Sequence, residues 1–350
     1  MESQEEAQID TNLYSRQIGT FGLETMGKLI KMQVAIVGLR GLGVECAKNL
    51  ILAGPKAVML YDPEITKIND LGANFYTELA HVGKVSRAEA CVGKLRELNP
   101  YVKVEVIPDE AALMNLIQSK ALHVVCQTEM ILNGQVLDPE MVDNTCRLGG
   151  CGYISSQTFG PWGYAFVDYG DAHMVTDADG EQTKNFIVVM ISKGTETVVT
   201  THEDKRHTYQ EGDFVEFREV EGMTELNGTG PYKVIKTTKH TFTLELDSSA
   251  FGDYTKQGIV ENKKMPKPVQ FHAWAESFKN PAGSSQYGML ETPDLAKFGR
   301  SEQLHAALFG ITLFVKANNR YPEDNETDTK QCVELTQNYV KEIGFEIELE

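Results

Sequence analysis

The sequence lacks the features of secreted and membrane-spanning proteins. Its six cysteines form no Cys-x-x-Cys pair, and their spacing does not indicate a disulfide framework. The longest clearly apolar stretches, such as residues 186–191, are far shorter than a membrane-spanning helix. The start, MESQEEAQID, is acidic and polar, whereas a secretory signal is basic and then apolar. We therefore expect a protein of the cytoplasm and nucleus, with reduced thiols and no membrane partner.

Basic residues are also scarce. The chain has 33 Lys and Arg against 50 Asp and Glu, a formal charge of −17, and nucleic-acid partners require a basic surface. The excess acid lies in residues 1–10 (−4), 171–265 (−6) and 321–350 (−7), and the remainder is neutral. The charge argues against a nucleic-acid partner and marks the two ends and one central block as distinct.

Residues 34–151 alternate between two periodicities. Short apolar runs, of the kind found in buried strands, are separated by stretches with apolar residues three and four apart. This alternation predicts an α/β domain with a mostly parallel sheet and helices on both faces. The expected strands are residues 34–38, 57–61, 102–107 and 122–126, and the expected helices are 43–54, 84–99 and 111–118.

Residues 186–260 show no convincing helical period, and their β-rich runs predict a small all-β barrel or sandwich. These runs are residues 186–191, 195–201, 214–220, 232–235 and 241–246. Because helical period returns at residues 301–315, the barrel is expected to be an insertion.

The expected division has three parts. Residues 1–171 and 266–320 form one discontinuous α/β domain, and residues 172–265 form the inserted barrel. Residues 321–350 hold the end of an exposed acidic linker (318–330) and a final amphipathic helix at about 330–343.

A glycine-rich turn, Gly38-Leu-Arg-Gly-Leu-Gly43, follows the first expected strand and opens a helix. This is the setting of a nucleotide-binding loop, in which the middle glycine lets backbone amides approach a phosphate. Here Arg40 takes the middle position, so the same turn also fits a simple strand-to-helix connection. Asp62 ends the second strand, where an acid can hold a ribose or serve as a turn residue.

Several stretches together resemble the adenylation domains of enzymes that activate ubiquitin and ubiquitin-like proteins. They are Ser15-Arg16-Gln17, GLRGLGVECAKNLILAG after the first strand, DLGANFY (70–76), GDFVEFREVEGMTELNG (212–228) and AKFGRSEQLH (296–305). The match is closest to the ubiquitin-activating enzyme, in its N-terminal, catalytically silent half, and covers essentially residues 12–320. The run at 212–228 resembles that enzyme's inserted first catalytic cysteine half-domain.

The resemblance implies that this half does not catalyse adenylation. Triphosphate chemistry depends on cationic and metal stabilisation, and the family's active members supply it at positions that differ here. Asp62 and Glu64 keep the acids of the strand end. Other residues replace the rest: Gly72 and Ala73 in place of polar and basic residues, Ser86 in place of a lysine (Lys84 and Arg87 lie nearby), and Cys126 and Gln127 where an aspartate binds metal.

Arg16 is the one catalytic candidate. In the family a matching arginine crosses to the partner adenylation half and meets the phosphates of its ATP, and a planar guanidinium suits that task. The resemblance further implies Mg-ATP bound by that partner half, ubiquitin as cargo, and ubiquitin-conjugating enzymes recruited through other domains. No cofactor or metal site is expected on this chain, and the family's thioester cysteine is not in the barrel, which has no cysteine.

Two other functions remain open at this point. An NAD-dependent oxidoreductase with a β insertion would use the glycine loop, although Arg40 and the lack of a hydride-transfer constellation argue against it. A catalytically silent interaction module would use the barrel. Cys146 and Cys151 form one close pair with no second pair for a zinc site, and Cys46 and Cys91 are expected to be packing residues.

Overall fold

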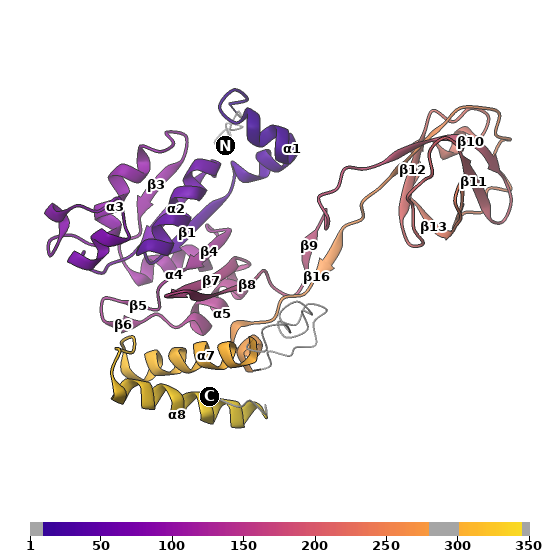
Figure 1. Ribbon diagram of the computed structural model, residues 1–350. Helices are drawn as coiled ribbons and strands as arrows, with labels where there is room; N and C mark the ends of the chain where they lie inside the picture. The colour runs from indigo at the N-terminus through magenta and orange to yellow at the C-terminus, as the bar shows by residue number, and fades with distance from the viewer. Residues whose placement is uncertain (1–9, 280–300, 345–350) are drawn as a thin grey trace. The chain divides into compact units, whose positions relative to one another are not determined.

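The computed structural model describes residues 10–279 and 301–344, and the chain divides into two compact units (Figure 1). The first comprises Met1–Asp171 with Gln270–Glu350, and the second comprises Ala172–Val269. Residues 1–9, 280–300 and 345–350, to which the predicted acidic ends and part of the expected α/β domain extend, lie outside the described residues.

The first unit contains a six-stranded sheet with the order β3-β2-β1-β4-β7-β8. The first five strands in this order are parallel, and β8 pairs antiparallel to β7. The strands are β1 (Gln33–Val37), β2 (Ala57–Tyr61), β3 (Lys103–Val106), β4 (Val124–Gln127), β7 (Gly152–Phe159) and β8 (Trp162–Asp168). The chain order reverses between β1 and β4, and open α/β sheets bind ligands at the carboxyl ends of the strands at such a point.

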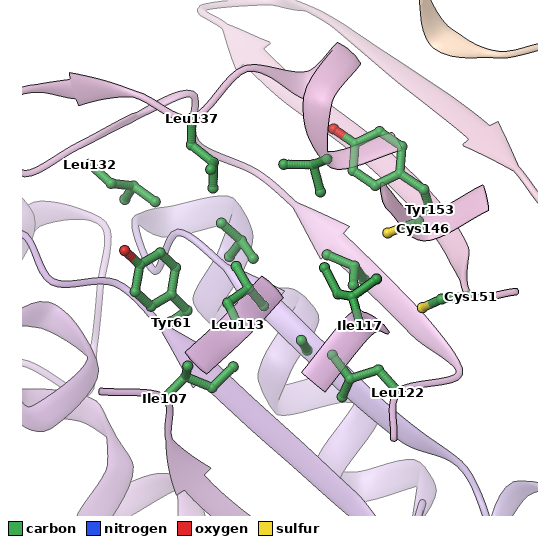
Figure 2. Close-up of a cluster of buried hydrophobic side chains, with 14 of the residues drawn as sticks. Tyr61, Ile107, Leu113, Ile117, Leu122, Leu132, Leu137, Cys146, Cys151 and Tyr153 are labelled. Atoms are coloured by element: carbon green, nitrogen blue, oxygen red, sulfur yellow. The ribbon is translucent and has the colours of Figure 1, made fainter. Parts of the chain in front are cut away.

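Alternating side chains of β1 enter two separate cores, because successive strand residues point to opposite faces. Val34 and Ile36 pack with residues of α2 (Gly41–Ala53) and α3 (Arg87–Arg96). The opposite face, with Val37, is covered by α4 (Glu110–Gln118), α5 (Pro139–Gly149) and α6 (Trp274–Lys279). Figure 2 shows this second core, in which Cys146 and Cys151 lie among apolar side chains. Helices therefore cover both faces of the sheet, and the predicted fold class is confirmed.

One arginine joins the chain segments that leave for the second unit and return from it. Arg147 on α5 binds Asp168 through Nε (2.6 Å), Asp171 through Nη1 (2.9 Å) and the Phe271 carbonyl through Nη2 (2.6 Å). The Phe271 N–H also donates to the Gly170 carbonyl over 2.9 Å. The segment that leaves the first unit (residues 168–171) and the segment that re-enters it (at Phe271) are therefore held side by side.

Two helices, α7 (Ser301–Asn318) and α8 (Glu326–Ile343), form a hairpin within the first unit. The prediction of an exposed acidic linker over 318–330 is wrong at residue 318, which ends α7, and beyond residue 325, where α8 begins. The Asn325 side chain caps α8 by accepting from the Asp328 N–H (2.9 Å). Acidic side chains are favoured in a helix's first turn, where the macrodipole is positive, so Glu326 and Asp328 mark a helix start.

The second unit is a closed barrel with the strand order β10-β11-β14-β13-β12-β15. Its strands are β10 (Asn185–Ser192), β11 (Thr197–Thr201), β12 (Phe214–Arg218), β13 (Tyr232–Thr237), β14 (Thr241–Leu244) and β15 (Ile259–Asn262). The five β-rich runs of the sequence correspond to the first five of these, and the short β15 closes the barrel. Phe186, Phe217 and Phe242 are buried inside it.

Helix α1 and several short elements complete the fold. The remaining elements are α1 (Ser15–Leu29), the pair β5 (Ile131–Leu132) and β6 (Gln135–Val136), the pair β9 (His173–Val175) and β16 (Lys267–Val269), and three short 3-10 helices (Ile68–Gly72, Leu79–His81 and Thr224–Leu226).

Within the described residues, no helix combines the length and apolar character needed to cross a membrane.

Candidate functional site

The glycine loop lies at the carboxyl end of β1, at the point where the strand order reverses. Gly38 has φ +90°, and a Cβ there would come within 2.5 Å of the Glu129 Cβ atom. A Cβ at Gly43 would lie 1.9 Å from the Gly38 carbonyl oxygen. Both outer glycines are therefore required by close packing, as the predicted strand-to-helix turn demands.

Asp62, at the end of β2, uses its carboxylate inside the protein. Its Oδ2 accepts the Leu39 N–H and the Arg87 Nε–H, each over 2.7 Å, and its Oδ1 accepts the Glu64 N–H over 3.1 Å. The Leu39 N–H, a loop amide of the kind that binds a phosphate in nucleotide-binding loops, thus donates to the Asp62 carboxylate. The geometry does not fit Asp62 as a ribose ligand, and it does not favour the NAD-dependent alternative.

Arg87 is completely buried at the start of α3. Besides the bond to Asp62, its Nη1 lies 3.6 Å from Asp70 Oδ1. Its Nη1 and Nη2 make no hydrogen bond within the described part of the chain. Burial raises the pKa of Asp62, and the positive charge of Arg87 opposes that rise. The guanidinium and the carboxylates therefore compensate one another within the protein interior.

Glu129, two residues beyond β4, covers the loop. Its side chain lies against Gly38, and its Oε1 is 3.6 Å from Arg40 Nε. Burial raises the pKa of Glu129 to about 7, against the opposing charges of Arg40 and Arg87. Glu129 was not among the predicted site residues, although an acid just after a strand at the reversal point was a usable signal.

The remaining substituted positions have structural tasks. Ser86 caps α3 by accepting the Glu89 N–H (3.2 Å), and Lys84 is exposed. Gln127 donates to the Leu137 carbonyl (2.8 Å) and accepts the Tyr153 hydroxyl (2.7 Å).

The 3-10 turn after β2 packs against the loop. A Cβ added at Gly41 would lie 3.1 Å from the Ala73 Cβ, whereas nothing lies within 4 Å of one added at Gly72. The neighbouring Asn74 donates to the Leu39 carbonyl (2.8 Å) and to the Cys91 sulfur (3.1 Å). The buried Asn74 side chain therefore holds this segment against the loop, whereas Gly72 and Ala73 are exposed.

A triphosphate would meet the carboxylates of Asp62 and Glu129 at this site, and the fully buried cation Arg87 is already paired with Asp62. Since the chemistry needs compensating positive charge, the residues present do not fit a nucleotide with its metal. In the described part of the chain, His, Cys, Asp and Glu side chains do not gather in groups of three or more that could hold a metal ion.

The cysteines pack as apolar residues. Cys91 and Cys146 are fully buried, and Cys46 is half-buried against the core beneath α2. Burial raises the pKa of Cys91 to about 11, which keeps it a thiol at neutral pH.

Arg16 is exposed near the start of α1, and no ion pair is recorded between its side chain and the described residues. Two residues earlier, Tyr14 is buried against Gly54 and accepts a hydrogen bond from Asn99 (3.0 Å). Gly54 caps the C-terminal end of the 13-residue helix α2, whereas the glycine loop opens its N-terminal end, roughly 20 Å away along the axis. The structure therefore anchors Arg16 at the end of α2 that lies away from the chain's own loop.

Three domain families match successive parts of the chain. The ThiF family matches residues 14–176, the ubiquitin-activating enzyme E1 FCCH domain matches 194–264, and the ubiquitin-activating enzyme E1 four-helix bundle matches 265–340. The expected division placed residues 266–320 with the first domain, whereas the last match groups 265–340 together. The division of that part stays a prediction.

Full-length relatives resemble the chain over nearly its whole length. Ubiquitin-like modifier-activating enzyme 1 of Homo sapiens is 37% identical over 333 residues, which cover 95% of this chain and 30% of the relative. Ubiquitin-activating enzyme E1 1 of Triticum aestivum is 37% identical over 93% of this chain and 30% of its own length. A Dictyostelium discoideum relative is 35% identical, with 99% and 33% covered. The chain thus spans about a third of the length of these proteins.

Removing the buried cation should destabilise the first unit. Arg87→Met keeps much of the side-chain volume but leaves buried carboxylates uncompensated, which costs about 3–5 kcal/mol of unfolding free energy. Urea unfolding at pH 7 measures this through tryptophan fluorescence, because the chain's 2 tryptophans, Trp162 and Trp274, both lie in the first unit.

Lys103→Met serves as the matched control, because Lys103 is exposed on β3 beside Glu105. It should change stability by less than about 0.5 kcal/mol. An Arg87→Met protein as stable as this control would contradict a stabilising role for the ion network.

Glu129 should make stability depend on pH. Its folded-state pKa of about 7 lies above the ordinary carboxyl value, so its contribution is present at low pH and is lost as pH rises through about 7. Glu129→Gln does not titrate, so its stability relative to the wild type should rise by about 2–3 kcal/mol between pH 5 and pH 8. Urea unfolding at several pH values measures the difference, and Glu105→Gln on β3 is the control, because the Glu105 side chain is 41% exposed. A difference that is constant with pH would refute the assignment.

Proposed function

Because this chain belongs to the family of ubiquitin-activating enzymes, we propose that it is the N-terminal, non-catalytic portion of an enzyme that activates ubiquitin. In such an enzyme, ATP-dependent adenylation of the ubiquitin C-terminus is followed by transfer to a cysteine as a thioester. The observation that carries the proposal is the filled glycine loop, where Glu129 lies on Gly38 and Asp62 holds the Leu39 amide. We place the enzyme in the cytoplasm and nucleus.

We assign Mg-ATP to a second, active adenylation half. On this chain the strand-end carboxylate of Asp62 is paired with Arg87 (2.7 Å), and Ser86 caps a helix where the family's lysine would stand. Neither a metal nor a triphosphate has suitable ligands there. The role left to this half is structural: it supports the partner half and the cargo.

Exposed apolar side chains support the pairing with that active half. Phe21 and Leu23 on α1 are 57 and 58% exposed, and Phe75 and Leu79 in the segment after β2 are 78 and 71% exposed. Each of these two segments thus exposes two large apolar side chains, and contact with a partner would remove their apolar area from water. On α2, Leu52 is 46% exposed.

The barrel is proposed to face ubiquitin. The central block that contains it, residues 171–265, carries a charge of −6, which favours the approach of a cargo with a basic surface. On β10, Ile187 and Met190 are 62 and 56% exposed. Ubiquitin-conjugating enzymes are assigned to other domains of the enzyme.

Arg16 is proposed to act in the partner's active site. Its exposure and its anchored position two residues after buried Tyr14 support a side chain that is held in place yet free to bind another surface. A guanidinium there would stabilise negative charge on the partner's ATP. Arg16→Ala in the full enzyme should lower the rate of ubiquitin-dependent pyrophosphate–ATP exchange at least tenfold, without changing the unfolding midpoint.

Lys28→Ala is the matched control, since Lys28 is an exposed cation in α1, beyond the kink at Gly22. It should leave the exchange rate within about twofold of the wild type. Unchanged exchange in the Arg16→Ala enzyme would remove Arg16 from the catalytic assignment.

Complementation tests the division of labour. The chain alone should show no ubiquitin adenylation, and mixing it with the separately expressed remainder of the enzyme should restore thioester formation. Phe75→Asp should weaken that association at least tenfold, because it places a charge in the proposed apolar interface. Leu148→Asp is the control, because Leu148 on α5 is also a highly exposed apolar residue (87% exposed). Failure of the unmodified chain to associate would overturn the proposed pairing.

A further inference from the structure

The loop between α7 and α8 reaches the glycine-loop site through one side chain. The Tyr321 hydroxyl donates to Glu129 Oε2 (3.4 Å) and accepts the Met130 N–H (3.2 Å) and the Gln157 Nε2–H (3.3 Å). A phenol has one proton and two lone pairs, so every hydrogen-bonding position of this hydroxyl is used. The contact joins residues that are about 190 positions apart in the chain.

Arg40 completes the contact. Its guanidinium carbon lies 5.9 Å from the centre of the Tyr321 ring, within the range of a cation–π interaction. Its Nε lies 3.6 Å from Glu129 Oε1. The residue that replaces the middle glycine of the loop therefore faces the same carboxylate and the same aromatic ring.

The loop that presents Tyr321 is internally braced. Arg320 pairs with Asp328 through both terminal nitrogens, at 2.5 and 2.8 Å. The Glu323 N–H donates to the same carboxylate over 2.8 Å, and Asp328 is only 3% exposed. A bidentate pair of this kind fixes geometry as well as contributing energy, so the loop holds the tyrosine in a defined position.

The hairpin is also attached beside the site. Lys316, near the end of α7, binds Asp138 over 2.9 Å and lies 5.1 Å from the centre of the Trp274 ring. At the other end of the hairpin, Tyr339 of α8 donates to the Phe278 carbonyl. Tyr321 lies between these attachments along the chain, and it is the one that reaches the glycine loop.

We propose that the glycine-loop site is a docking site for the tip of the α7–α8 hairpin, with Tyr321 in the role that a nucleotide would otherwise have. Arg40 and Glu129 bind the ring and the hydroxyl, and Tyr321 is a positioning residue that fixes the hairpin on the α/β unit. This inference goes beyond the proposed function, because it concerns the use of the site within this half.

Hydrogen exchange of the full 350-residue chain tests the docking. Tyr321→Phe keeps the ring and removes the hydroxyl, so amides in residues 319–330 should exchange at least tenfold faster. Amides of β10 to β15 in the second unit should be unchanged. Tyr101→Phe is the control, because the Tyr101 side chain is 63% exposed. Wild-type exchange rates in the Tyr321→Phe hairpin would overturn the proposal.

A double-mutant cycle separates direct contact from general loosening. Contacting residues show non-additive effects, so Tyr321→Phe should accelerate hairpin exchange less than threefold when Glu129 is already alanine. Equal acceleration in both backgrounds would refute the contact with Glu129. Neither readout uses ubiquitin or ATP, so failure here is distinguishable from failure of the proposed function.

Discussion

The ion pair between Asp62 and Arg87 is the interaction on which the region around the glycine loop depends. It joins the end of β2 to the first residue of α3 and, through the Leu39 amide, to the loop itself. Buried charges are tolerated only when they are paired and hydrogen-bonded. Because the Arg87 guanidinium is buried here, the nearby carboxylates of Asp62 and Asp70 compensate its charge. These charges are therefore balanced within the protein, and no ligand is needed to balance them.

Much of the fold could be predicted from the sequence, because the information is local. The apolar runs at β1 and β2 and the turn residues between barrel strands are short-range signals. The strand β15 was not predicted, because four residues with two apolar side chains do not stand out from a loop. The start of α8 was predicted too late, because Glu326 and Asp328 were interpreted as linker acids although Asn325 marks them as the first turn of a helix.

The candidate site divides in the same way. Substitutions such as Ser86 and Ala73 could be read directly, since each occupies a recognisable place beside a known pattern. The contacts of Tyr321 could not, because no local rule connects a tyrosine between two helices with a carboxylate about 190 positions earlier. Arg87 was identified only as a neighbour of the expected lysine, and its burial follows from the tertiary packing of α3. Contacts between residues far apart in the sequence, such as Tyr321 with Glu129, therefore determine which side chains occupy the site.

The contacts of Arg147 bear on how the α/β unit accommodates an inserted domain. By binding Asp168, Asp171 and the Phe271 carbonyl, Arg147 keeps the two junctions of the barrel together on the α/β unit, where the Phe271 and Gly170 backbones are directly hydrogen-bonded. The stability of the α/β unit therefore depends only weakly on the length of the chain between those junctions, because the entropic cost of closing that chain grows slowly with its length. In evolutionary terms, such a clamp makes residues 172–269 an exchangeable module, which can lengthen, diverge or take on a new surface while the sheet keeps its architecture.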